Sequence, residues 1–291
     1  MNRQVLIVSL AGWLVMPGAC PAAPRPPLDR TVGTLGGPTG AAVPLPSGDQ
    51  LIRRMLDRSA AKAAATNGPA WTYDKRTLME KLGGDAKVEE RTEKLYRVRI
   101  IRGVPFSRLI GVSGRDLNPA EIQKENEREA AFQKHLSGRD PKKAVNRREA
   151  LITKDVLERF EYQVLRREIL QGRQTVAVSF EPKSGPDNGS IQDRLFSRLA
   201  GMVWVDEATG DVARLQVRLT KEFSLGMLGV LGAVKECRMN LESKVMSDGT
   251  WLPEKTTLSM SARMLLSNVR FQMEESSSNF TLEPVSGSAP P

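Results

Sequence analysis

The feature that most constrains this chain is a series of long alternating segments joined by short turn signals. Many of these segments carry charged residues on one side and a sparse set of apolar residues on the other. This alternation is typical of antiparallel strands with one face in water. The pattern predicts one antiparallel meander, with strands opening at 71–73 and continuing over 87–102, 105–112, 161–170, 174–181, 200–206, 212–223, 235–246, 250–264 and 269–277.

Two helical regions accompany the predicted sheet. A helix is expected to begin near Asp49, because Leu51, Ile52, Met55 and Leu56 fall on one face at helical spacing. A charged helical insert is expected at about 118–160. Its start is marked by Asn118-Pro119-Ala120-Glu121, which combines a capping residue, a proline at the first helical position and a glutamate three residues after the cap.

These elements predict an α+β fold. We expect a curved antiparallel β-sheet, an unclosed half-barrel, with the N-terminal helix and the helical insert covering its concave side. Apolar residues between sheet and helices would form either a solid core or a cavity for an acyl chain. The chain has 11 methionines, which modestly favour an adaptable interior because thioethers repack easily.

The segment 223–234 (FSLGMLGVLGAV) departs from the alternating pattern. It is nearly all apolar and has glycines at every third position, at 226, 229 and 232. Two interpretations stay open: a buried hairpin or loop, and an apolar flap over a cavity or a tip that touches lipid. The second interpretation gives as candidate lipid-binding residues Phe223, Leu225, Met227, Leu228 and Leu231, together with Met260 and Met264 of a neighbouring strand.

The first 22 residues have the pattern of a secretion signal. Arg3 provides a basic end, an apolar run follows over 5–16, and small residues and prolines come next. An apolar run of about 7–15 residues before a small-residue cleavage region is the secretory pattern. Cleavage after Ala22 would release the protein into the periplasm. Cleavage after Ala19 would leave Cys20 first, available for lipidation and anchoring to the outer membrane, and both alternatives stay open.

The rest of the chain divides into three parts. Residues 23–48 are rich in Pro, Ala and Gly and predict a disordered tether, and 284–291 predict a similar flexible tail. The region 49–283 is long enough for one domain with a packed core. The only cysteines are Cys20 and Cys237, so the fold must rest on that core and not on disulfides.

The formal net charge is +9. Nucleic acid is not expected as a partner, because the chain carries an export signal and its basic residues are interleaved with acidic ones. One basic patch stands out, with Lys142, Lys143, Arg147 and Arg148 within seven positions. It is either a solvated linker or a docking surface for anionic lipid head groups or an acidic partner.

The residue inventory argues against an enzyme. His135 is the single histidine, no G-x-S-x-G elbow is present, and His135 with Cys237 cannot supply a usual metal-ligand set. Adjacent carboxylates such as Glu274-Glu275 are expected on the solvated side of a strand. We therefore expect no catalytic residue, no metal and no cofactor.

Four short stretches occur in a characteristic order: Trp71-Thr-Tyr73, the stretch from Gly103 to Ile110 (GVPFSRLI), the stretch from Gly201 to Asp206 (GMVWVD), and the stretch from Asp248 to Pro253 (DGTWLP). In these stretches the chain resembles the bacterial envelope proteins grouped with outer-membrane lipoprotein-sorting proteins. The strand pair that includes 261–263 and Phe271 adds to the resemblance, which covers about 49–283. It implies the fold of the periplasmic lipoprotein carrier and its acceptor, an unclosed β-barrel with helices as a lid, and binding without catalysis.

Two functional hypotheses follow. The first is a monomeric, non-enzymatic periplasmic protein that binds a lipid acyl chain or a lipidated protein in the half-barrel, with a role in outer-membrane lipoprotein sorting. The alternative is an envelope interaction or stress-sensor module that docks a protein partner or makes peripheral membrane contact through its basic helical insert.

Overall fold

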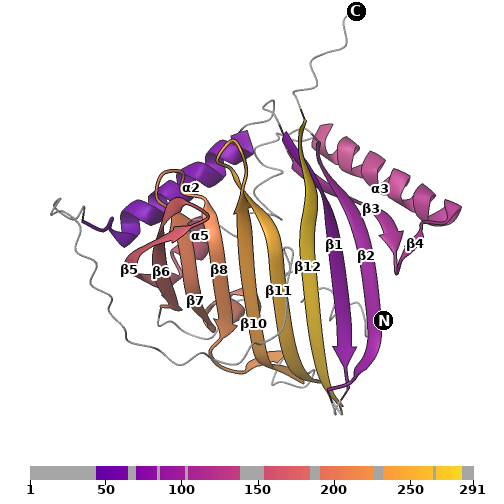
Figure 1. Cartoon of the computed structure of the whole chain (residues 1–291). Coiled ribbons are helices and arrows are strands. Elements are labelled where there is room, and N and C mark those ends of the chain that lie inside the picture. Colours follow the sequence, from indigo (N-terminus) through magenta and orange to yellow (C-terminus); the bar gives the residue numbers. More distant parts are fainter. Residues whose placement is uncertain are drawn as a thin grey trace, which may run out of the picture.

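A computed structural model of the chain describes residues 44–64, 70–83, 86–101, 104–137, 154–183, 191–225, 232–264 and 267–283. Within these ranges the chain forms one twelve-stranded sheet and four helices (Figure 1). The helices are α2 (Gly48–Ala64), α3 (Pro119–Ser137), α5 (Lys154–Leu157) and α6 (Ile191–Phe196). The strands are β1 (Ala70–Leu82), β2 (Val88–Ile101), β3 (Val104–Val112), β4 (Arg115–Asp116), β5 (Phe160–Leu170), β6 (Arg173–Pro182), β7 (Leu199–Asp206), β8 (Val212–Leu219), β9 (Phe223–Leu225), β10 (Gly232–Val245), β11 (Trp251–Met264) and β12 (Ser267–Glu283).

The strands pair in the order β4-β3-β2-β1-β12-β11-β10-β8-β7-β6-β5, with β9 attached to β10. Every neighbouring pair is antiparallel. The first long strand pairs with the last, so the two ends of the domain meet in the middle of the sheet. β4 and β5 lie at opposite ends of the order, and the sheet is therefore not closed into a barrel. The predicted α+β class with an open antiparallel sheet is confirmed.

Both predicted helix starts are capping boxes. At α2 the Ser47 hydroxyl accepts a hydrogen bond of 3.2 Å from the backbone amide of Gln50. The Gln50 side-chain oxygen accepts one of 3.0 Å from the backbone amide of Ser47. At α3 the Asn118 side chain accepts from the Glu121 amide and the Glu121 carboxylate accepts from the Asn118 amide, both at 2.9 Å. Each box satisfies backbone donors that a helix otherwise leaves free at its start.

The predicted single strand over 212–223 is interrupted at residues 220–222, which separate β8 from β9. The backbone amide and the hydroxyl of Thr220 still donate to the carbonyl of Arg198, at 2.7 and 3.0 Å, and so extend the pairing of β8 with β7. The chain pairs with β10 again only at Phe223, opposite Val234. The last strand is also longer than predicted, because β1 supplies partners for β12 as far as Glu283.

The two long helices, α2 and α3, lie toward opposite ends of the sheet (Figure 1). α2 packs across β5–β8, where Leu51 and Met55 are buried in one apolar cluster with residues of β5, β6 and β7. We call the sheet face that α2 covers the inner face. α3 lies beside β3 at the other end, where Glu129 forms ion pairs with Arg99 at 2.8 Å and with Arg108 at 2.5 Å. Of the predicted insert at 118–160, α3 and α5 are described, and residues 138–153 lie outside the described residues.

Candidate functional site

The inner face is a continuous apolar surface that crosses most of the sheet. Its side chains form a row in which each residue is paired directly with the next across the ladder. From β6 to β1 this row contains Phe180, Gly201, Val217, Met239, Leu258, Met273 and Met79. Directly paired side chains on one face of a sheet contact each other. The row therefore joins the α2 end of the sheet to its centre.

The part of the inner face around β10, β11 and β12 is rich in sulfur. Its buried cluster contains Met239, Met260, Met273 and Cys237 together with aliphatic residues and Phe223, and Met79 of β1 packs against it. Thioethers are flexible and polarizable, so a methionine-rich surface adapts to apolar partners of varied shape. This surface is suited to contact with an apolar chain.

The α2 cluster and the methionine-rich cluster are continuous. Both are flanked by the same partly buried side chains, Leu195, Leu215, Val217 and Leu219. The helices contribute unequally, however. Leu51 and Met55 of α2 are members of the first cluster, whereas among the described residues Leu195 of α6 is the one apolar helical side chain at the second. The methionine-rich cluster thus lies on the sheet beyond the reach of α2.

Cys237 lies inside this cluster. It pairs with Met260 across the ladder and is 6% exposed. Burial raises the pKa of the Cys237 thiol to about 12, because the thiolate is poorly solvated there. At neutral pH the group is therefore a protonated, apolar part of the surface and not a nucleophile.

Two arginines border the cluster at Phe223. The guanidinium groups of Arg194 and Arg198 lie 5.9 and 5.8 Å from the centre of the Phe223 ring, which is almost fully buried. Cations at this distance from an aromatic ring are attracted to its face. This end of the apolar surface therefore carries positive charge beside a buried aromatic ring.

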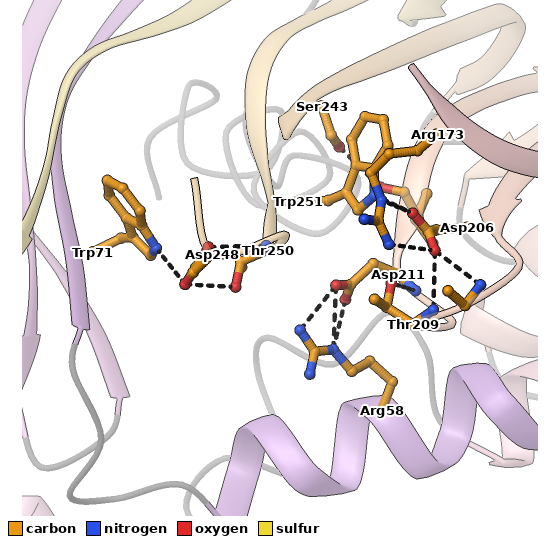
Figure 2. A network of polar contacts seen from close by, with 12 residues as sticks. Arg58, Trp71, Arg173, Asp206, Thr209, Asp211, Ser243, Asp248, Thr250 and Trp251 are labelled. Carbon is orange, nitrogen blue, oxygen red and sulfur yellow. Dashed lines mark hydrogen bonds and ion pairs between the residues drawn. The ribbon is translucent and has the colours of Figure 1, made fainter. Parts of the chain in front are cut away.

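A polar network attaches α2 to the turn between β7 and β8 (Figure 2). Arg58 of α2 donates to both oxygens of Asp211, with bonds of 3.0–3.2 Å, and the Asp211 side chain is 3% exposed. Arg54, one helical turn earlier, donates to the carbonyl of Glu207 at 2.7 Å. Bidentate arginine–carboxylate pairs fix orientation as well as position, so α2 is held in one pose over the inner face.

Asp206 is the centre of this network. Its buried carboxylate accepts from Arg173, from the indole of Trp251 at 2.8 Å and from the Thr209 amide at 2.9 Å. Burial disfavours the charged carboxylate, but these donors outweigh burial and lower the pKa of Asp206 to about 2. Because all of these partners stabilise the turn, the network is a scaffold for the site and not a reactive centre.

A second polar group lies on the inner face itself, beside the methionine row. Glu275 of β12 is 5% exposed and accepts a hydrogen bond of 2.7 Å from the Thr77 hydroxyl. Lys75 of β1 approaches the other carboxylate oxygen, Oε2, at 3.5 Å. The Lys75 ammonium also lies 5.2 Å from the centre of the Tyr96 ring. We call Lys75, Thr77, Tyr96 and Glu275 the polar cluster.

Burial dominates the acid–base behaviour of this cluster. The pKa of Glu275 is raised, because burial of its carboxylate outweighs the Lys75 charge and the bond from Thr77. The pKa of Tyr96 is raised to about 12 by burial and, secondarily, by the charge of Glu275. Buried ionisable groups beside an apolar surface are candidates for ligand recognition.

The structure corrects the expectation for Glu274-Glu275. Glu275 does not lie on the solvated side of its strand. Adjacent strand residues point to opposite faces, so only Glu274 points outward, where it pairs with Lys255 at 3.4 Å. Strict alternation along 269–277 was the signal that could have placed Glu275 on the inner face.

The predicted lipid-binding residues are only partly described. Phe223 and Met260 belong to the same buried cluster. Leu225 lies in β9 and Met264 at the end of β11, and their side chains lie outside the described ones, as do residues Met227, Leu228 and Leu231. The docking candidates Lys142, Lys143, Arg147 and Arg148 and the lipidation candidate Cys20 also lie outside the described residues. All of these assignments stay predictions.

Two further observations concern the described residues alone. No group of three or more His, Cys, Asp and Glu side chains among them is arranged to hold a metal ion. None of their helices is both long and apolar enough to cross a membrane.

A scan against protein-family models and a search of curated proteins both find no match. Solved structures do match. An outer membrane lipoprotein-sorting protein domain from Vibrio parahaemolyticus is 11% identical with a TM-score of 0.34, over 79% of this chain and 93% of that one. A LolA superfamily protein from Nitrosomonas europaea is 8% identical with a TM-score of 0.28, over 80% of this chain and 93% of that one. The MucA/MucB complex of Pseudomonas aeruginosa matches at 10% identity with a TM-score of 0.25, over 82% of this chain and 100% of that one.

The matched structures include lipoprotein-sorting and LolA superfamily proteins, the group that the sequence motifs resemble. At identities of 8–11% and TM-scores of 0.25–0.34, the likeness concerns the fold alone.

Proposed function

We propose that this chain is a non-enzymatic protein of the bacterial envelope that binds a lipid acyl chain or a lipidated protein on the inner face of its open sheet. The observation that carries the proposal is the methionine-rich cluster of β10, β11, β12 and β1. It lies on the face that α2 covers elsewhere, and among the described residues Leu195 is the one apolar side chain that reaches it from a helix.

The chemistry of this surface favours an apolar chain. Burying apolar surface stabilises a complex by about 25 cal/mol per Å², and methionine side chains adjust to the shape of what they contact. The inert Cys237 thiol adds apolar area without reactivity. The secretion signal and the tether predicted from the sequence support a periplasmic location for such a protein, free or lipid-anchored.

The proposal is tested by native mass spectrometry of the full chain, purified from bacteria without detergent. We expect a fraction of the protein to carry bound acyl lipid, which organic extraction then identifies. A protein that is lipid-free under these conditions and does not take up added palmitate would contradict the proposal.

A matched pair of substitutions locates the bound lipid. Met260→Gln places an amide in the methionine-rich cluster and should reduce the lipid-bound fraction by about tenfold, since an unpaired amide on an apolar surface costs about 1–3 kcal/mol. Met202→Gln is the control, because Met202 packs against a separate cluster with Trp204 and Trp251. Equal loss in both variants would place the lipid elsewhere.

A further inference from the structure

The polar cluster lies at the border of the apolar surface. Glu275 pairs across the ladder with Thr77 on one side and Thr256 on the other, and Thr256 pairs in turn with Leu241. Two residues further along the same strands, at the next position on this face, Met273 pairs with Met79 and Leu258. The inner face thus changes from apolar to polar between two successive residue pairs on that face.

One oxygen of Glu275 is incompletely satisfied. Oε1 accepts from Thr77, but the buried Oε2 has no hydrogen-bond donor in the part of the chain that the structure describes, and the Lys75 ammonium lies 3.5 Å away. A buried carboxylate oxygen without a donor is costly. A ligand that donates a hydrogen bond to Oε2 would remove this cost.

The charges of the cluster define the kind of donor. Lys75 and Glu275 are opposite charges in contact, so the cluster has no net charge to attract an ionic head group. An anionic group would be repelled by Glu275, and a cationic one by Lys75. An uncharged donor, such as a hydroxyl or an amide N–H, meets neither repulsion. Lys75 and Tyr96 both keep part of their surface exposed, so a ligand would approach the buried Oε2 from their side.

We infer that the polar cluster is a subsite for the head of an amphiphile, where Glu275 accepts a hydrogen bond from an uncharged hydroxyl or amide while the acyl chain lies along Met79, Met273 and Met239. This inference rests on the proposed function, because the acyl chain occupies the surface assigned there. It adds a specificity that an apolar surface alone does not provide.

The test compares two probes with the same sixteen-carbon chain, 1-monopalmitoylglycerol and methyl palmitate. Only the first has hydroxyl donors. Native mass spectrometry of the full chain with both probes at equal concentration measures their relative occupancy. We expect about a tenfold preference for monopalmitoylglycerol, as one hydrogen bond to a charged group provides.

Glu275→Gln should lower this preference several-fold while methyl palmitate binds as before, because the ligand hydroxyl then bonds a neutral amide and no longer a charged carboxylate. Glu274→Gln on the other face is the matched control and should keep the preference. Thermal unfolding checks that both variants fold. If Glu275→Gln does not fold, the preference of the wild type for monopalmitoylglycerol alone decides whether the subsite exists.

The outcomes separate the two proposals. If both probes bind the wild type equally, or if Glu275→Gln keeps the full preference for monopalmitoylglycerol, the proposed subsite is wrong and the proposed acyl-binding function stands. If neither probe binds, the acyl-binding function is wrong, and the subsite falls with it.

Discussion

Glu125 and Arg128 of α3 together bind the part of the β3 edge that β4 leaves unpaired. The Glu125 carboxylate accepts a hydrogen bond of 3.0 Å from the Leu109 amide, and the Arg128 guanidinium donates to the Ser107 carbonyl. The two side chains also form an ion pair at 2.6 Å. They take the place that the backbone of a neighbouring strand would have, and an uncovered strand edge is a site for pairing with other chains.

Replacing Glu125 by Ala should therefore expose this edge locally. We expect the Leu109 amide to exchange with solvent about fivefold faster, since the lost bond contributes about 1 kcal/mol. Hydrogen exchange with mass spectrometry or NMR measures the change. Glu127→Ala is the control, because the Glu127 carboxylate accepts a hydrogen bond of 2.9 Å from the Gln123 side chain of the same helix and not from β3. Unchanged exchange at Leu109 would show that α3 does not protect the edge.

The attachment of α2 should depend on Arg58. Arg58→Met leaves the buried Asp211 carboxylate without its bidentate partner, and we expect unfolding to become easier by about 1–3 kcal/mol. Chemical unfolding followed by tryptophan fluorescence measures this difference. Arg53→Met on the exposed side of α2 should change stability by less than about 0.5 kcal/mol. An equal effect of the two substitutions would argue against the role of the Asp211 pair.

The free energy of unfolding should fall at low pH because Asp206 becomes protonated. Its pKa in the folded protein is about 2, below its ordinary value of 3.8. The carboxylate therefore stabilises the fold fully above pH 4, and this contribution is lost as the pH falls toward 2. We expect wild type to lose about 2 kcal/mol over this range from Asp206 alone.

Asp206→Asn should be less stable at pH 7 and lack this part of the pH dependence. Urea unfolding of both proteins between pH 2 and pH 7 provides the comparison. Parallel curves for the two proteins would rule out the predicted contribution.

Cys237 should resist alkylation in the folded protein. With Cys20→Ser it is the only thiol, and its burial and high pKa predict labelling by iodoacetamide at pH 8 at least about 100-fold slower than in guanidinium chloride. Mass spectrometry of timed samples measures both rates. Labelling of the native protein at the unfolded rate would mean that the methionine-rich cluster is open to water.

Much of the fold could be predicted from the sequence, because most of its signals are local. Alternation placed the long strands, and the Ser47 and Asn118 capping boxes lie where the helices start. The break between β8 and β9 could not be predicted, since residues 220–222 contain no glycine or proline and only the pairing with β10 separates the two strands. The pairing of β1 with β12 is likewise a long-range contact without a local signal.

The candidate site was less predictable. Phe223 and Met260 were identified from an apolar segment and a regular strand, and both lie in the cluster on the inner face. The polar cluster was missed, because Lys75 and Glu275 are 200 positions apart and each resembles an ordinary solvated charge in its own strand. Only the register between β1 and β12 brings them together.

An acyl chain on the inner face should lie over the methionine-rich cluster. NMR of the full chain labelled with ¹³C at the methionine methyl groups detects it there upon addition of monopalmitoylglycerol. We expect chemical-shift changes for Met79, Met239, Met260 and Met273, which share that face, and none for Met202, which packs with Trp204 and Trp251. No shift in the four methionines, or shifts confined to Met202, would contradict it.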